Sequence, residues 1–278
     1  MNIIVTVKQV PDTQNVTGEA MKPDGTVNRA SLPAIFNPED LHALEMALAL
    51  KDQLGGKVTV ITIGPSSAVN VLKDAIFRGA DFGILISDRR FAGADTLATS
   101  YILKLAIEKI AKYDIIICGR QAIDGDTAQV GPQIAEKLNL NQITAVTDLI
   151  IDQTDKKTIT LERKNDIGHE LVQANYPLLL TVTKDANTPR FYSAKKLMAY
   201  KNLTADSGKN PGPSQLIVEW NLEAIDADEK KCGFNGSPTK VKEIESVILT
   251  TSNSQNIECN YGAIKDMIVK LREEHILG

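Results

Sequence analysis

Apolar runs and helical periodicities alternate along the first half of the chain. Short runs rich in β-branched residues predict strands at 2–10, 57–63, 82–86 and 115–118. Apolar residues at helical spacing predict helices over 37–55, 71–79 and 94–111, and another helix follows Ile134. Strands that alternate with helices of this length indicate right-handed βαβ units. We therefore predict an α/β fold built on an open, mostly parallel sheet with helices on both faces.

The helix over 37–55 has the clearest start. Asn37 is expected to cap the free N–H groups, and Pro38 fits the first helical position. Glu39 and Asp40 complement the positive end of the helix dipole. Gly55 and Gly56 then end the helix.

The pattern changes beyond residue 140. Further strands are expected at 143–151, 158–163, 170–175 and 178–183, which indicates an antiparallel β extension at a sheet edge. Residues Asp24-Gly25 predict a small hairpin. After a Gly- and Pro-rich linker, periodicity weakens to a strand over 216–220 and a helix over 261–274.

About 65 residues with so little apolar periodicity would fold poorly alone, so they are expected to form an extended C-terminal arm that lies against a partner subunit. The predicted division is an α/β domain over 1–184, a recognition loop with linker over 185–210 and the arm over 211–278.

A polar, Gly-rich loop joins the strand over 115–118 to the next helix. It runs from Gly119 to Gln133, at the carboxyl end of a strand and before a helix N-terminus. Ligands of open α/β sheets bind at such positions, where free N–H groups meet phosphate. The loop matches neither GxGxxG nor GxxxxGK[ST], and an ordinary βα loop with surface carboxylates is the alternative. The pattern alone favours a nucleotide site only slightly.

Composition excludes several classes of protein. Lys plus Arg number 31 against 35 Asp plus Glu, a net charge of −4, and nucleic-acid carriers are usually basic. No apolar run approaches the roughly 20 residues of a membrane span, and the start of the chain resembles a strand more than a signal peptide. Cys118, Cys232 and Cys259 are isolated, so a reduced, cytoplasmic setting without a disulfide framework is expected. The three His residues are scattered, and we expect no protein metal.

Four stretches together resemble the β (small) subunit of electron-transferring flavoproteins, over essentially the whole chain. They are Val5–Asp12, Asn37–Asp40, Gly119–Gln133, and Pro189-Arg190-Phe191 with Leu197-Met198. Gly236–Thr239 also resembles a family element. The resemblance implies an adenine-nucleotide-binding α/β fold and a heterodimer with a larger α subunit that carries an electron-delivering FAD.

Nucleotide contacts carried over by matching position all fall at the carboxyl ends of predicted strands or at helix starts. They are Thr6, Asn37, Pro38, Glu39, Asp40, Ile63, Asp124, Gly125, Asp126, Thr127, Ala128, Gln129, Val130, Gly131, Pro132, Gln133, Ile134 and Ala135. Phosphates are expected to meet backbone N–H groups and the Thr127 hydroxyl. Asp124 and Asp126 are expected to order the loop, since like charges repel.

The resemblance leaves two nucleotides to choose between. Plain mitochondrial-type members hold a structural AMP, and electron-bifurcating members hold a second FAD. Gly125 replaces a third acid that AMP-holding members tend to carry, which favours FAD here. The resemblance then implies that NADH gives hydride to this FAD, one electron passes to ferredoxin or flavodoxin, and the other crosses the α-subunit FAD to a flavin dehydrogenase. No catalytic side chain is expected, because the flavin supplies the redox chemistry.

The segment from Asp185 to Lys201 matches the family's recognition loop, which docks on acyl-CoA dehydrogenases. The candidate recognition residues are Pro189, Arg190, Phe191, Ala194, Leu197 and Met198. Ala194 stands where typical members carry an anchoring Leu, so either Leu197 and Met198 replace that anchor or the partner is a different flavin dehydrogenase. Two further hypotheses are a nucleotide-sensing binding protein without a redox role, and an ATP-using ligase or pyrophosphatase. The recognition-like segment speaks against the first, and the absence of a Ser-Gly-Gly-type phosphate loop against the second.

Overall fold

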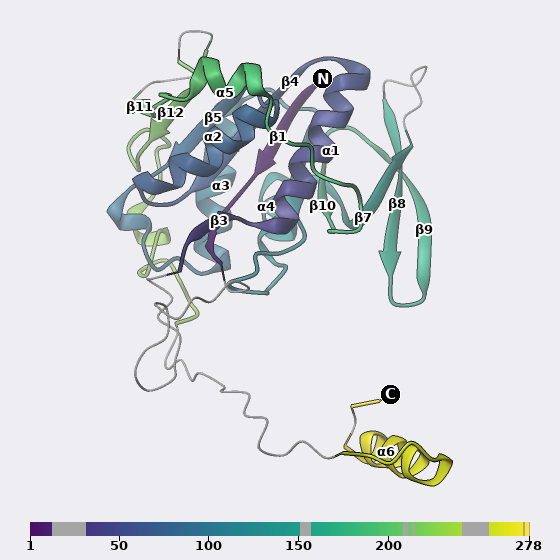
Figure 1. Ribbon diagram of the computed structural model, residues 1–278. Coiled ribbons are helices and arrows are strands. Elements are labelled where there is room, and N and C mark those ends of the chain that lie inside the picture. Colours follow the sequence, from purple (N-terminus) through teal and green to yellow (C-terminus); the bar gives the residue numbers. More distant parts are fainter. Residues whose placement is uncertain are drawn as a thin grey trace.

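A computed structural model describes residues 1–12, 32–150, 157–207, 211–212, 215–240, 256–274 and 276–277. Helices cover both faces of one large sheet (Figure 1). α1 (Pro38–Leu54) and α2 (Val69–Arg78) lie on one face, and α3 (Thr96–Ile110) and α4 (Val130–Leu138) lie on the other. Each face has its own buried apolar cluster. The predicted α/β fold with helices on both faces is confirmed.

The large sheet contains ten strands within the described residues, in the order β11-β12-β5-β4-β1-β6-β10-β7-β8-β9. Their bounds are β1 Asn2–Thr6, β4 Lys57–Ile63, β5 Phe82–Ile86, β6 Ile115–Gly119, β7 Asn141–Ile150, β8 Thr158–Asn165, β9 Gly168–Asn175, β10 Leu178–Val182, β11 Asp206–Ser207 and β12 Ile217–Trp220. Neighbours pair in parallel except β7 with β8 and β8 with β9. Ile3, Ile4 and Val5 of β1 are at most 1% exposed, because helices cover both sides of the strand.

The predicted strand over 2–10 divides in two. β1 ends at Thr6, and β2 (Gln9–Pro11) pairs antiparallel with β3 (Ala34–Phe36) in a separate two-stranded sheet. The chain between β1 and β2 therefore leaves the main sheet. The hairpin expected at Asp24-Gly25 lies outside the described residues.

The predicted antiparallel extension is confirmed for β7, β8 and β9, which pair antiparallel in that order, and it is wrong for β10. β10 inserts between β6 and β7 and is parallel to both. All five of its residues are buried, and a continuous apolar run such as Leu178-Leu179-Leu180 is typical of a strand covered on both faces. The hairpin of β8 and β9 therefore forms the edge, and β10 returns into the sheet.

The C-terminal region contributes more to the sheet than its weak pattern indicated. β12 confirms the predicted strand over 216–220, but it pairs with β5 inside the main sheet, and Trp220 is fully buried. Ile225 and Cys232 extend the same apolar cluster, so residues 215–240 pack on this chain's own sheet. Ser237 accepts a hydrogen bond from the backbone N–H of Asp95, at the start of α3.

Further along, α6 (Tyr261–Glu273) confirms the predicted helix. It lies apart from the sheet in Figure 1, with Tyr261 85% and Ile268 43% exposed. Packing of this arm on another subunit stays a prediction. The short α5 (Ala194–Tyr200) sits beside α2.

Candidate functional site

The carboxyl ends of β1, β4 and β6 meet at one end of the sheet, which is the lower side in Figure 1. Thr6 pairs with Ile61 of β4 on one side and with Cys118 of β6 on the other. The start of α1 and the loop from Gly119 to Gln129 lie at this same end. We call it the carboxyl edge.

Asn37 joins the start of α1 to this loop. Its side-chain amide donates to Gln121 O at 2.9 Å, and its Oδ1 accepts from the backbone N–H of Ile123 at 3.2 Å. It makes no capping hydrogen bond to α1, so the predicted cap is wrong. The amide is fully buried, and the two hydrogen bonds to Gln121 and Ile123 fix the loop, beside a further contact with the Asp40 carboxylate.

Glu39 holds the same loop by two further groups. One carboxylate oxygen accepts from the Gln121 N–H at 2.8 Å, and the other accepts from the Arg120 guanidinium at 2.9 Å. The Glu39 side chain is only 9% exposed, whereas that of Arg120 is 41% exposed. The carboxylate thus points inward, toward the loop backbone.

Asp40 is buried beneath Gly119. Its Oδ2 accepts from the Lys8 N–H at 2.8 Å, and the Gly119 N–H also donates to the carboxylate. A Cβ at position 119 would overlap Asp40 Oδ1 and lie 2.8 Å from the Asp40 nitrogen. Only glycine fits there, because the first turn of α1 packs directly on the end of β6.

The carboxylates of the loop are engaged within the chain. Both oxygens of Asp124 accept from Lys8 Nζ at 2.7 Å, and Asp126 accepts from Gln121 Nε2 at 2.9 Å. Asp126 has a φ of 49° and Ala128 a φ of 53°, so the loop passes twice through the left-handed region. Asp124 thus ties the loop to the chain after β1, and Asp126 joins two parts of the loop, whereas their position relative to a phosphate stays a prediction.

The loop leads into α4 with its backbone donors free. Among the residues that the structure describes, no acceptor pairs with the N–H groups of residues 127 to 131. These groups form the positive end of α4, where anions bind favourably. Gly131 packs against β10, since a Cβ there would lie 2.7 Å from Thr181 Cγ2.

Gln129 and Gln133 are tied to the neighbouring helix α3. Gln129 accepts from the Thr96 hydroxyl at 3.0 Å, and Gln133 accepts from Ser100 at the same distance. Ile134 and Ala135 are fully buried in the core, so their side chains do not face the carboxyl edge. Gly125 lies on the open side, and a Cβ there would meet nothing within 4 Å.

Apart from Ile134 and Ala135, the predicted nucleotide contacts lie at or next to the carboxyl edge, and they are of two kinds. Their contact with a nucleotide stays a prediction. Asn37, Glu39 and Asp40 position the loop from beneath, and residues 127–130 present their backbone N–H groups to solvent or to a ligand. The supporting roles of Lys8 and Arg120 were missed, since no local pattern marks a side chain whose partner lies about a hundred residues away.

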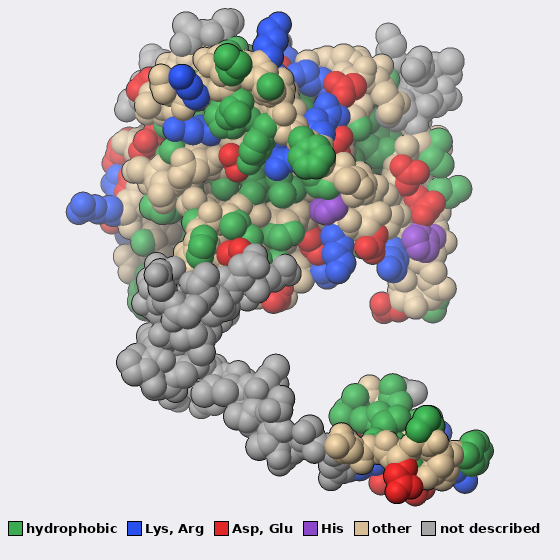
Figure 2. Space-filling model, viewed as in Figure 1, with side chains coloured by type: hydrophobic (Ala, Val, Ile, Leu, Met, Phe, Trp, Pro, Cys, Tyr) green, Lys and Arg blue, Asp and Glu red, His purple; other side chains and the backbone are tan. Residues whose placement is uncertain are grey.

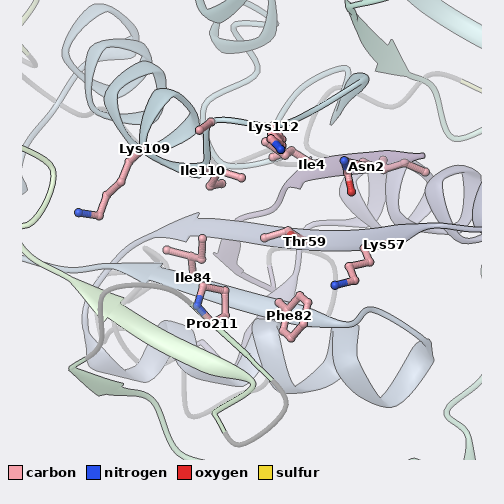
Figure 3. A pocket seen from close by; sticks show the side chains of 12 residues that line it. Asn2, Ile4, Lys57, Thr59, Phe82, Ile84, Lys109, Ile110, Lys112 and Pro211 are labelled. Atoms are coloured by element: carbon pink, nitrogen blue, oxygen red, sulfur yellow. The ribbon is translucent and has the colours of Figure 1, made fainter.

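Two hollows are lined by residues other than the loop from Gly119 to Gln129. A cavity of about 380 Å³ opens at the amino end of β1, β4 and β5, and Figure 3 shows Lys57, Phe82 and Lys109 around it. A groove of about 390 Å³ runs between α1 and α2 beneath Tyr192. No group of three His, Cys, Asp or Glu side chains suited to a metal ion occurs in the described part of the chain.

The segment from 185 to 201 crosses the face formed by α1 and α2. Arg190 binds Glu45 through its guanidinium and backbone N–H, and it also meets Asp52 at 2.9 Å. Phe191 is 93% exposed and Met198 is 78% exposed. Figure 2 shows hydrophobic side chains over this part of the surface. Arg190 therefore anchors the segment to α1, while the large apolar side chains project outward.

Comparison with known proteins gives one family match and several full-length relatives. The electron transfer flavoprotein domain matches residues 24–209. The chain is 41% identical to the electron transfer flavoprotein subunit beta of Clostridium acetobutylicum, with all of both chains covered. It is 40% identical to the caffeyl-CoA reductase-Etf complex subunit CarD of Acetobacterium woodii and 38% identical to the acryloyl-CoA reductase electron transfer subunit gamma of Anaerotignum propionicum, again over all of each chain. None of the described helices has the length and apolar character of a membrane span.

Proposed function

Because this chain belongs to the electron transfer flavoprotein family, as a relative of its β subunits, we propose that it binds FAD at the carboxyl edge and transfers electrons within a heterodimer. NADH is the proposed hydride donor, and ferredoxin or flavodoxin receives one electron. The other electron passes through the FAD of the α subunit to a flavin dehydrogenase. When bound, FAD supplies the hydride and single-electron chemistry.

The free backbone donors at the start of α4 are the observation that supports this proposal most directly. The N–H groups of residues 127–131 point to no acceptor within the described chain, and two negative charges of a diphosphate suit the positive end of a helix. The nearby Asp124 is already neutralised by Lys8 at 2.7 Å. The carboxylates of Glu39 and Asp40 are directed inward, where they accept from backbone N–H groups, and as acceptors they offer a phosphate no hydrogen bond.

Gly125 supports FAD over AMP. A side chain at this position would enter open space beside the free N–H groups, so its absence leaves room there. An acidic residue at 125 would add a negative charge beside Asp124 and Asp126 and repel a second phosphate. A structural AMP without electron bifurcation is the alternative function.

The chain's residues would bind and orient the nucleotide and need not transfer a proton. The partner dehydrogenase is proposed to act on a CoA thioester, since two relatives are named as subunits of caffeyl-CoA and acryloyl-CoA reductases. The segment from 185 to 201 is the proposed contact with that partner.

Nucleotide content tests the proposal. The chain is co-purified with its α subunit, the nucleotides are extracted with acid, and FAD and AMP are counted per heterodimer. Two FAD are expected. One FAD with one AMP would support the alternative, and no flavin would exclude the electron-transfer role.

The variant Gly125→Asp sharpens this test. It should lose the FAD of this subunit and keep that of the α subunit. Gly125→Ala is the matched control, because its methyl group also meets nothing within 4 Å but carries no charge. Equal FAD content in both variants would contradict the placement of the diphosphate.

A further inference from the structure

Asp40 combines burial, charge and position in a way that the proposed electron transfer does not use. The side chain is almost completely buried, with the residue 7% exposed, yet it belongs to the first turn of a helix at the carboxyl edge. It joins the chain after β1, through the Lys8 N–H, to the end of β6, through the Gly119 N–H. The loop that precedes α4 follows directly on β6 and is tied to the chain after β1 by the ion pair of Lys8 with Asp124.

The groups that hydrogen-bond to this carboxylate are all donors. They are the backbone N–H groups of Lys8 and Gly119 and the side-chain amide of Asn37. An ionised carboxylate has enough lone pairs to accept all of them. Protonation uses one lone pair and adds an O–H for which these three groups offer no acceptor, and it weakens the remaining hydrogen bonds because the acceptor loses its charge. The contact at Gly119 is close, because even a Cβ at this position would overlap Asp40 Oδ1.

The charged groups around Asp40 are engaged with one another. In the chain after β1, Lys8 directs its ammonium to Asp124 of the loop, and on α1 Glu39 pairs with Arg120. From β6, the buried Cys118 thiol stays neutral because burial raises its pKa to about 12. Burial raises the pKa of Asp40 itself to about 7, against the opposing effect of its hydrogen bonds. The carboxyl group therefore changes charge near neutral pH.

We propose that Asp40 is a positioning residue that couples nucleotide affinity to protonation: ionised, it holds the chain after β1 and the end of β6 in place for the loop before α4, and protonated, it holds them more weakly. This inference rests on the proposed function and adds its regulation. The nucleotide then binds better to the ionised form of Asp40, so binding at a pH below the pKa of this group releases a proton. Affinity therefore rises with pH and levels off above about pH 7.

A direct electrostatic effect would act in the opposite direction. A negative phosphate close to an ionised Asp40 would be repelled, and binding would then strengthen on acidification. The Asp40 carboxylate lies beneath Gly119 and accepts hydrogen bonds from three N–H donors. The ammonium group of Lys8 binds Asp124 of the loop. Positioning should therefore exceed repulsion, and the sign of the pH dependence separates the two effects.

The test is a binding titration of the heterodimer with FAD, and in parallel with AMP, between pH 5.5 and 8.5, counting nucleotide beyond the α-subunit FAD. The expected result is a Kd about fivefold higher at pH 6 than at pH 8, within the limit of tenfold per pH unit for one proton. A flat profile, or tighter binding at pH 6, would overturn the inference. No second nucleotide at any pH would instead refute the proposed function.

Three variants assign the effect. Asp40→Asn should raise the Kd on the order of tenfold at pH 8 and remove the pH dependence. Glu39→Gln should weaken binding at every pH and keep the profile, because it removes loop support without removing the proton. Asp114→Asn is the matched control, since Asp114 accepts from the Asn2 N–H at the other end of β1, at 2.6 Å, and should behave as the wild type.

An unchanged pH profile in Asp40→Asn would contradict the positioning role. Should that variant fail to fold, as judged by its circular dichroism, the wild-type profile together with Glu39→Gln and Asp114→Asn still decides the question.

Discussion

At the carboxyl edge, the polar side chains are engaged with the chain itself and the backbone is left open, whereas the segment from 185 to 201 shows the reverse. Asn37 and Glu39 both bind the loop backbone, and the N–H groups that follow at 127–131 have no acceptor in the described chain. In the other region, Arg190 fixes the backbone to α1 and Phe191 stands 93% exposed.

The difference corresponds to two kinds of recognition. A phosphate is bound best by donors that are fixed in advance, because no ordering cost then accompanies binding. A protein surface is recognised through apolar area that becomes buried, so large side chains must remain accessible before the partner arrives. Each region therefore uses ion pairs for positioning and leaves a different group for the ligand.

The largest expected effect comes from filling the contact between α1 and β6. Gly119→Ala forces a methyl group into Asp40 and should destabilise the protein by about 3 kcal/mol or more and abolish nucleotide binding, because backbone must move. Urea unfolding and nucleotide content measure the two effects. Gly125→Ala, six residues along the same loop, should change the free energy of unfolding by less than about 0.5 kcal/mol. Similar losses in the two variants would show that the loop is not held from beneath.

The next effect concerns the anchor of the other region. Arg190→Ala removes the hydrogen bonds to Glu45 and leaves that carboxylate, whose side chain is 13% exposed, without its cation. The Glu45 carboxylate, together with Asp52, raises the pKa of Arg190 against the opposing effect of burial, so the guanidinium is charged at all ordinary pH. We expect a loss of about 1–2 kcal/mol, measured by unfolding, and faster proteolysis within 185–201. Nucleotide content should not change, and a parallel loss of nucleotide would mean that the two regions are coupled.

The sequence predicts most of the central fold because its strands carry their own pattern. The runs over 57–63 and 82–86 match β4 and β5 residue for residue. The misplacement of β10 has a physical cause: an apolar run shows that a strand is buried, but not which strands lie beside it. β12 was hard to place for a similar reason, since its partner β5 lies more than a hundred residues earlier.

The sequence likewise predicts one part of the candidate site and not another. The position of the loop before α4 follows from the order of strand, glycine-rich loop and helix. The role of Asn37 does not, because a residue before a helix can serve equally well as a cap or as a link to another segment. Only the folded chain shows that Gln121 and Ile123 lie within reach of its amide.

A smaller effect is expected at the ion pair that closes the loop. Lys8→Met keeps the apolar part of the side chain but removes the ammonium group that donates to Asp124 at 2.7 Å. The two side chains are 47% and 25% exposed, so solvent screening limits the loss of stability to about 0.5 kcal/mol. Nucleotide should bind about threefold more weakly at low salt, because Asp124 then faces the phosphates without its cation. A loss of affinity that persists in 0.5 M salt would instead indicate that Lys8 contacts the nucleotide.

The smallest effect on stability is expected where the apolar side chains are exposed. Phe191→Ser should leave the free energy of unfolding within about 0.5 kcal/mol of the wild type, because the residue is 93% exposed. It should nevertheless slow electron transfer to the partner dehydrogenase, which reduction of that enzyme by the heterodimer would measure. Ile167→Ser is the control, since Ile167 is 96% exposed at the turn between β8 and β9 and lies outside the segment. If both substitutions slow the transfer equally, the partner contacts a wider surface than 185–201. If neither does, the exposed phenylalanine has no part in docking, and the contrast with the carboxyl edge must rest on other residues of the segment.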